Sequence, residues 1–128
     1  MSKNQWEKRV EVFHYVYSTL MSDVKDKDII KNAFEQFTFS ADQMKIIEYY
    51  ANNKQEIINL ISTRLQNNWT WERISAVTQA ILLTSYSESQ ALTIDKKIVI
   101  DQALITADKY CEPNEKKFIN AILDKIIK

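Results

Sequence analysis

The stretch PNEKKFINAILDKIIK, residues 113–128, points most directly to the fold class of this chain. Proline is favourable at the first position of a helix, because the amide hydrogen that it lacks would have no partner there. After Pro113, the apolar side chains recur at helical spacing; they are Phe118, Ile119, Ile122, Leu123 and Ile126. This spacing predicts a last helix with a broad apolar face.

The composition of the whole chain extends this prediction to an all-α fold. The 128 residues include no glycine and one proline, and 45% of them are hydrophobic. Sheets with tight turns and loops that hold phosphate need glycine where the backbone bends sharply or approaches a ligand. The composition therefore argues against a β-sandwich, a doubly wound sheet and a glycine-rich phosphate loop. The length suits a single domain with a core of its own.

Apolar residues at helical spacing also recur in the first half of the chain. They predict one helix over residues 6–20 and a second over residues 29–37. Ser40 and Gln43 have the spacing of a capping box, in which each side chain bonds to the backbone amide of the other residue, so a third helix is expected after Ser40. The apolar residues between 57 and 65 either continue this third helix or form a helix of their own.

The second half of the chain predicts two helices before the last one. Thr70 can cap a helix that carries Trp71 and the apolar residues up to Leu82. Thr93 or Asp95 can cap the next helix. Six or seven helices with short connections imply a compact all-α bundle.

Residue types that carry catalysis or bind metal are scarce. His14 is the only histidine and Cys111 the only cysteine, so neither belongs to a motif with metal-ligand or disulfide spacing. A nucleophilic couple of Cys111 and His14 stays open beside the simpler interpretation of an inert thiol and an ordinary imidazole. Most carboxylates lie next to lysines on polar faces, where catalytic carboxylates are not expected. The sequence predicts no enzyme, cofactor or metal site, but a surface that binds a partner.

The charges balance over the whole chain but not along it. Seventeen basic side chains oppose seventeen acidic ones, yet residues 1–21 and 96–128 together carry +3 and residues 22–95 carry −3. The two ends are therefore the better places to expect an anionic partner. A single cysteine cannot form a disulfide within the chain, which indicates a reducing compartment. The sequence also has no apolar segment long enough to cross a membrane, so we expect a cytoplasmic protein without membrane association.

The second half of the chain resembles the NusB family. The resemblance rests on five segments in the order of the family's motifs: Trp69-Thr70-Trp71-Glu72-Arg73-Ile74, Ala80-Ile81-Leu82, Tyr86-Ser87-Glu88, residues 97–103 and residues 117–125. The opening helix of the family, Arg-x-x-Ala-x-Gln-x-Leu-Tyr, is similar to residues 9–17. The chain departs from the family at Leu83, where arginine is usual, and at Ala121, where glycine is usual.

The resemblance implies one domain made of two stacked helical subbundles, residues 1–66 and 67–128. It also implies a transcription antitermination factor for ribosomal RNA operons. Such a factor binds boxA-like single-stranded RNA together with NusE, which is also a small-subunit ribosomal protein, within the antitermination complex of RNA polymerase. Family members occur as monomers and as dimers, so both a monomer and a homodimer stay open.

The residues indicated for RNA binding lie at the two ends of the chain; they are Lys3, Lys8, Arg9, Lys116, Lys117 and Phe118. Lysine and arginine meet phosphates, and an aromatic ring can stack on an unpaired base. The ordinary alternatives are solvated basic side chains and, for Phe118, a place in the core. The resemblance to the family favours Phe118 near the surface and Ile119 and Ile122 inside.

Four further residues are indicated for the protein-partner surface; they are Tyr17, Tyr86, Glu88 and Asn114. Tyrosine combines apolar area with a hydroxyl group and is enriched at interfaces. Tyr17 also fits the apolar stripe of its helix, and Asn114 fits an ordinary helix start. Trp6, Trp69 and Trp71 are expected to be packing residues.

Two alternatives to the antitermination role stay open. One is a protein-interaction module of the same fold with weakened RNA binding, which the zero net charge and the few arginines near the amino terminus favour. The other is a detached targeting domain of an rRNA cytosine methyltransferase, because the NusB-like fold also occurs fused to such enzymes.

Overall fold

The computed structural model describes residues 3–128, and in this range the chain forms six α-helices, two short 3₁₀ helices and no β-strand. The α-helices are α1 (Gln5–Met21), α2 (Ile29–Gln36), α3 (Ala41–Ser62), α4 (Ala76–Ala91), α5 (Lys96–Tyr110) and α6 (Pro113–Ile126). The 3₁₀ helices span Asp26–Asp28 and Trp71–Arg73. The predicted all-α fold with six to seven helices is confirmed.

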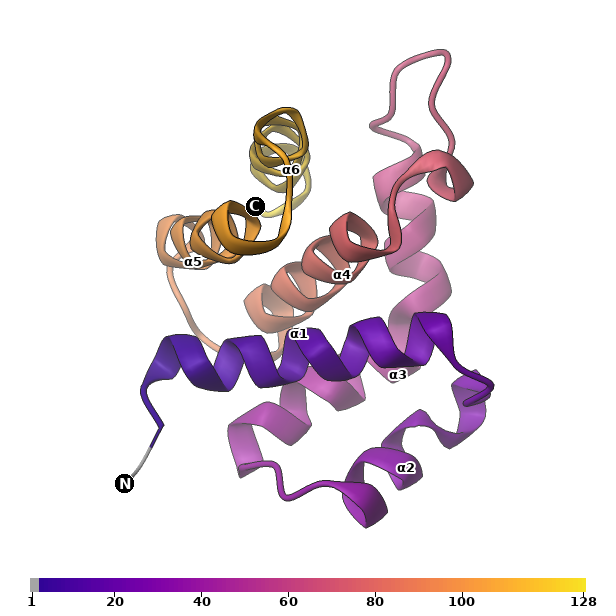
Figure 1. Cartoon of the computed structure of the whole chain (residues 1–128), viewed down its shortest axis with the longest axis vertical. Helices are drawn as coiled ribbons and strands as arrows, with labels where there is room; N and C mark the ends of the chain where they lie inside the picture. The colour runs from indigo at the N-terminus through magenta and orange to yellow at the C-terminus, as the bar shows by residue number, and fades with distance from the viewer. Residues whose placement is uncertain (1–2) are drawn as a thin grey trace.

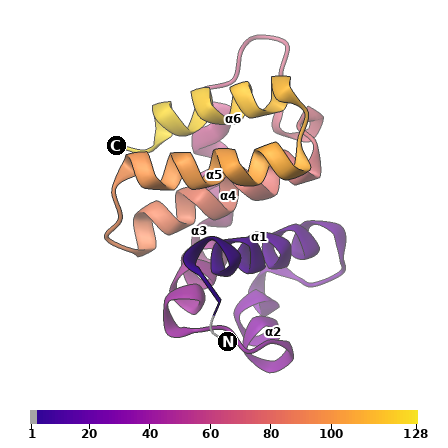
Figure 2. The ribbon, with the colours of Figure 1, turned by 60° about the vertical axis from the view of Figure 1, so that its left-hand side comes forward.

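The helices form two layers that share the long helix α3. Figure 2 shows α1 and α2 on one side of the molecule and α4, α5 and α6 stacked on the other. α3 runs past both groups, from the neighbourhood of α2 to that of α4 (Figure 1). α4 contacts α1, α3, α5 and α6, so it is the central element of the core. The division of the chain between residues 66 and 67 stays a prediction.

The centre of α4 is buried on all sides, which explains why it lacks a polar face. Six consecutive residues, 80–85, are buried, and Leu82 and Leu83 have no exposed surface. Leu83 occupies the position where the NusB pattern has arginine, and here it belongs to the apolar core. None of the helices in residues 3–128 has the length and apolar character that a membrane span requires.

Local capping signals define two of the helix starts as the sequence predicts. Ser40 Oγ accepts a hydrogen bond from the Gln43 amide at 3.2 Å, and Gln43 Oε1 accepts one from the Ser40 amide at 2.8 Å. The helix that begins there continues to Ser62, so the apolar residues 57–62 belong to α3. Pro113 occupies the first turn of α6, as expected.

The predicted start of α4 is wrong by one turn and a half. Thr70 precedes the 3₁₀ helix Trp71–Arg73 and makes no side-chain capping bond, and extended backbone at Ile74 then separates that helix from α4. Ser75 caps α4 instead, since its Oγ accepts a hydrogen bond from the Thr78 amide at 3.3 Å. α5 begins after Asp95, the second of the two predicted caps, but the Asp95 side chain makes no capping bond.

Candidate nucleic-acid interface

Three basic residues lie at the start of α1, and each has a different environment. The Lys3 ammonium pairs with Glu11, and 54% of the Lys3 side chain is exposed. Lys8 is half-buried and lines a hollow between α1, the start of α3 and the α4–α5 connection. Arg9 is turned inward. An exposed ion pair contributes at most about 1 kcal/mol to stability, so another anion can compete with Glu11 for Lys3.

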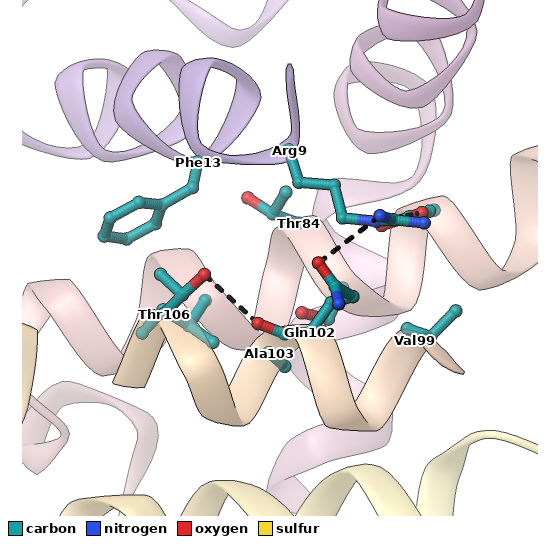
Figure 3. A pocket seen from close by; sticks show the side chains of 10 residues that line it. Arg9, Phe13, Thr84, Val99, Gln102, Ala103 and Thr106 are labelled. Carbon is teal, nitrogen blue, oxygen red and sulfur yellow. Dashed lines mark hydrogen bonds and ion pairs between the residues drawn. The ribbon is translucent and has the colours of Figure 1, made fainter. Parts of the chain in front are cut away.

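The Arg9 side chain crosses from α1 to α4 and α5 (Figure 3). Its Nε donates to Oε2 of Glu88 at 2.7 Å, and a terminal guanidinium nitrogen donates to Oε1 of Gln102 at 3.5 Å. Only 17% of the Arg9 side chain and 5% of the Glu88 side chain are exposed. Burial raises the pKa of Glu88, and the guanidinium opposes that rise. The structure thus pairs a residue predicted at the RNA surface with one predicted at the protein-partner surface.

A small hollow adjoins this ion pair between α1, α4 and α5 (Figure 3). Phe13, Val99 and Ala103 give it a largely apolar lining, and Thr84 and Thr106 add hydroxyl groups. The two charges in the hollow are paired with each other. Beside this hollow, the contacts of Arg9 with Glu88 and Gln102 link α1 to α4 and α5.

The start of α6 is held in place by a second capping box and by bonds to α4. Glu112 and Glu115 form the capping box. Oε2 of Glu115 also accepts hydrogen bonds from the hydroxyl groups of Thr78 at 2.7 Å and Ser75 at 2.8 Å. These hydroxyl groups, that of Thr78 first, lower the pKa of Glu115. The ionised carboxylate therefore ties the first turn of α6 to the first turn of α4.

Two lysines follow this anchored turn. Lys116 pairs with Asp108 of α5 at 2.7 Å, while Lys117 is exposed. Within residues 3–128, no carboxylate lies within ion-pair distance of Lys117. Cations near the start of a helix are repelled by the helix dipole, and an anion bound there relieves the repulsion. Lys117 therefore presents an exposed ammonium group without an ion-pair partner in the described residues.

Phe118 lies at the edge of a groove between α6 and the α3–α4 connection. Its ring centroid is 6.4 Å from that of Trp69, and the Arg73 guanidinium lies 5.7 Å from the centroid of the Trp69 ring. Asn114 also lines the groove. Phe118 is half-buried whereas Ile119 and Ile122 are buried, which confirms the predicted orientation of the helix.

Sequence reasoning missed the two residues that complete this groove. Trp69 was expected to pack, but 53% of it is exposed because it lies in the connection between α3 and α4 and not in a helix. Arg73 is not among the residues that the sequence indicates for a site. Trp69 and Arg73 are four residues apart and lie just before Ser75, which caps α4. An aromatic and a basic residue at this spacing before a helix start are the pattern from which the sequence could have indicated them. Trp6 and Trp71 do pack against the core.

The other candidates for a protein-partner surface lie apart from Glu88. Tyr86 is half-buried on α4, with its ring centroid 6.4 Å from that of Tyr49 on α3. Tyr17 is half-buried against the core, and Asn114 is exposed at the start of α6. Glu88 is 4% exposed and satisfied by Arg9, so its carboxylate is closed to a partner in this structure.

His14 and Cys111 have separate partners. His14 Nε2 lies 3.2 Å from the Tyr110 hydroxyl oxygen, and Cys111 Sγ lies 3.9 Å from Thr78 Oγ1. Burial raises the pKa of the Cys111 thiol. Since the thiolate is the reactive form of cysteine, this environment favours the inert interpretation.

Comparison with known proteins identifies the family. The model of the NusB family matches residues 8–128. The chain belongs to the NusB family. Within the family, it is 33% identical to the transcription antitermination protein NusB of Borreliella burgdorferi, over 95% of this chain and 92% of that protein. It is also 26% identical to an uncharacterized protein of Mycoplasma pneumoniae, over 94% of this chain and 81% of that protein.

A solved structure supports the fold independently. T. maritima NusB matches with a TM-score of 0.85 at 25% sequence identity, over 99% of this chain and 92% of that chain. The layered arrangement of α1–α3 and α4–α6 is therefore the NusB fold.

Proposed function

We propose that this member of the NusB family is a transcription antitermination factor that binds boxA-like single-stranded RNA together with NusE. The observation that carries the proposal is the groove at the start of α6. Two partly exposed aromatic rings and an arginine lie together in this groove, and the exposed Lys117 lies on the α5 side of the same helix turn, next to Lys116. Cations that follow the backbone and rings that stack on unpaired bases are the usual means of holding single-stranded RNA. The antitermination proteins among the relatives support the same role.

In this proposal the α6 groove provides the main contact. Lys117 and Arg73 meet phosphates, and an unpaired base stacks on the exposed surface of the Phe118 and Trp69 rings. Lys116 joins them when the RNA displaces Asp108, because a single exposed ion pair is weak. The bonds of Glu115 to α4 hold these side chains at a fixed position.

The start of α1 provides a second and weaker contact. Lys3 and Lys8 meet phosphates there. Arg9 does not itself contact the RNA. Its ion pair with Glu88 holds α1 against α4, which fixes the positions of Lys3 and Lys8. NusE binds on a surface that includes Tyr17, Tyr86 and Asn114.

A titration of labelled boxA-like RNA, with and without purified NusE, tests the proposal. We expect NusE to tighten RNA binding at moderate salt and Lys117→Glu to weaken it. Lys125→Glu is the matched control, since Lys125 is exposed in the last turn of the same helix. No gain in RNA affinity from NusE, or equal losses for the two variants, would reject the proposal.

The second candidate is a protein-interaction module of the same fold with weakened RNA binding. The observation that favours it is that three of the five basic side chains considered, Lys3, Arg9 and Lys116, already have carboxylate partners. It predicts that NusE binds with the same affinity in the presence and absence of RNA and with little dependence on salt. The same titration, with NusE labelled, separates the two candidates.

A further inference from the structure

A strip of aromatic side chains, in two groups, lies on both sides of α1, toward α5 and toward the α2–α3 connection. The strip consists of Trp6, His14, Tyr110, Phe37 and Phe39. Figure 1 shows α1 between α5 on one side and the α2–α3 connection on the other. These residues lie outside the α6 groove.

On the α5 side, a ring contact joins His14 to Tyr110, and the Lys109 ammonium lies between Tyr110 and Trp6. The His14 and Tyr110 rings meet edge to face, with centroids 5.5 Å apart, and their polar atoms lie 3.2 Å apart. The ammonium group of Lys109 lies 5.5 Å from the centroid of the Tyr110 ring and 5.4 Å from that of Trp6. The Trp6 indole donates to Thr106 at 3.3 Å, which fixes the ring against α5.

On the other side of α1, Phe37 and Phe39 form a nearly parallel stack. Their centroids are 5.2 Å apart with an angle of 18° between the rings. Both rings meet Tyr15 edge to face, and 47% of Phe37 is exposed. The groove beside the stack is also lined by His14 and Lys3. His14 contacts Tyr110 and lines the groove of the stacked Phe37 and Phe39, so the two halves of the strip adjoin at His14.

The cations and the position of the strip point to its ligand. Lys109 lies over the Trp6 and Tyr110 rings, and the neighbouring carboxylate of Asp108 is engaged by Lys116. Lys3 lines the groove of the phenylalanine stack, where it pairs with Glu11 and must leave that exposed pair to meet a phosphate. The C-terminal end of α5, which carries Tyr110, leads through two residues into the start of α6. Exposed rings interleaved with cations are typical of surfaces that bind single strands without base pairing.

We propose that this strip is a second base-stacking surface, which takes the single-stranded RNA beyond the segment held at α6. Unpaired bases stack on Phe37 and Tyr110, and phosphates meet Lys3 and Lys109. The inference rests on the proposed function, since it lengthens the path of the same RNA. It adds Phe37, Tyr110 and Lys109, for which the sequence predicts no role in RNA binding.

The test compares RNAs of increasing length, because only the longer ones reach the strip. Labelled boxA-like RNAs, extended stepwise at the 5′ end or at the 3′ end, are titrated against the protein with NusE. We expect extension at one end to raise the affinity of the unaltered protein. Phe37→Leu and Tyr110→Leu should each weaken binding of the extended RNA about fivefold or more, while binding of the shortest RNA stays unchanged.

Phe34→Leu is the matched control, because Phe34 is a phenylalanine of α2 that is 76% exposed and lies outside the strip. Leucine keeps apolar volume at position 37, where the ring contacts Tyr15, and thermal melting verifies that each variant is folded. As a second measurement, extended RNA with 4-thiouridine should crosslink to peptides that contain Phe37 or Tyr110.

The outcomes separate the strip from the proposed function. Equal affinities for Phe37→Leu and Phe34→Leu, with no crosslink to the strip, would overturn the strip while RNA binding at α6 stands. Weaker binding of NusE by Phe37→Leu in the absence of RNA would show a protein-docking surface instead and would also overturn it. If the unaltered protein with NusE binds no RNA of any length, the proposed function and the strip fail together.

Discussion

The starts of α1 and α6 carry similar basic residues, yet the structure leaves them unequally available. At the start of α1, Lys3 pairs with Glu11, Arg9 is buried against Glu88, and Lys8 is half-buried. At the start of α6, Lys116 pairs with Asp108, but Lys117 is exposed and free of such a partner within residues 3–128. The charge count along the sequence does not show which of these cations are paired. Whether a cation can bind RNA is decided by the carboxylates that other segments bring to it.

The largest expected effect concerns Arg9, which is buried against Glu88. Arg9→Met should lower the free energy of unfolding by about 3 kcal/mol, because it leaves the buried Glu88 carboxylate without its partner. Denaturant unfolding measures the loss. Arg64→Met at an exposed position is the control and should stay within about 0.5 kcal/mol of the unaltered protein. Similar losses in both variants would show that Arg9 does not hold α1.

The loss of unfolding free energy in Arg9→Met should depend on pH. The folded-state pKa of Glu88 is raised, so its ionised form costs stability above that pKa and the cost disappears as the pH falls below the unfolded value. Arg9→Met removes the opposing guanidinium. The stability difference between Arg9→Met and the unaltered protein should therefore be largest near neutral pH and shrink on acidification.

Unfolding free energies at several pH values check this expectation. With Glu88→Gln in both backgrounds, the side chain at position 88 is neutral throughout, and the pH dependence of the difference should vanish. A difference that stays constant with pH in the Glu88 background would contradict the structural role of the ion pair.

The anchoring of α6 can be weakened separately. Glu115→Ala removes one half of the capping box and the acceptor for Ser75 and Thr78, and should cost about 1–2 kcal/mol of unfolding free energy. Because the pKa of Glu115 is lowered, its contribution is present above the unfolded pKa and is lost as the pH falls through the folded pKa. Unfolding at neutral and acidic pH measures both effects. Glu35→Ala, at an exposed residue of α2, serves as the control.

The smallest expected effect separates the lysines of the two ends. The logarithm of the RNA association constant falls linearly with the logarithm of the salt concentration, and each phosphate contact to a single strand contributes about −0.7 to the slope. Lys117→Ala should reduce the slope by about that amount, and Lys3→Ala by less, because Glu11 competes with the phosphate for Lys3. Titrations at several salt concentrations measure the slopes. A larger change for Lys3→Ala would reverse the ranking of the two ends.

Local signals were enough to predict much of the fold. The lack of glycine argued against sheets, and the capping box at Ser40 and the proline at 113 located two helix starts. Each signal acts within a few residues, so no knowledge of the rest of the chain is needed. That Phe118 lies nearer the surface than Ile119 was predicted from the resemblance to the family, since the apolar spacing alone favours a place in the core.

Features that depend on distant residues were beyond the sequence. Arg9 and Glu88 are 79 residues apart, and only the packing of α1 on α4 brings them together. Thr70 and Ser75 are equally good caps by residue type, but Ser75 also bonds to Glu115, which lies 40 residues later. The exposure of Trp69 follows from the path of the α3–α4 connection, which no periodic pattern describes.

The most direct test of the central claim, that RNA binds at the start of α6, is a site-resolved one. BoxA-like RNA is added to the isotope-labelled protein in complex with unlabelled NusE, and the backbone amide signals are followed by NMR. We predict saturable shifts for residues 114–118 and for the segment from Trp69 to Arg73, larger than those at the start of α1. Saturable binding of the RNA that leaves these two segments unchanged would contradict the account.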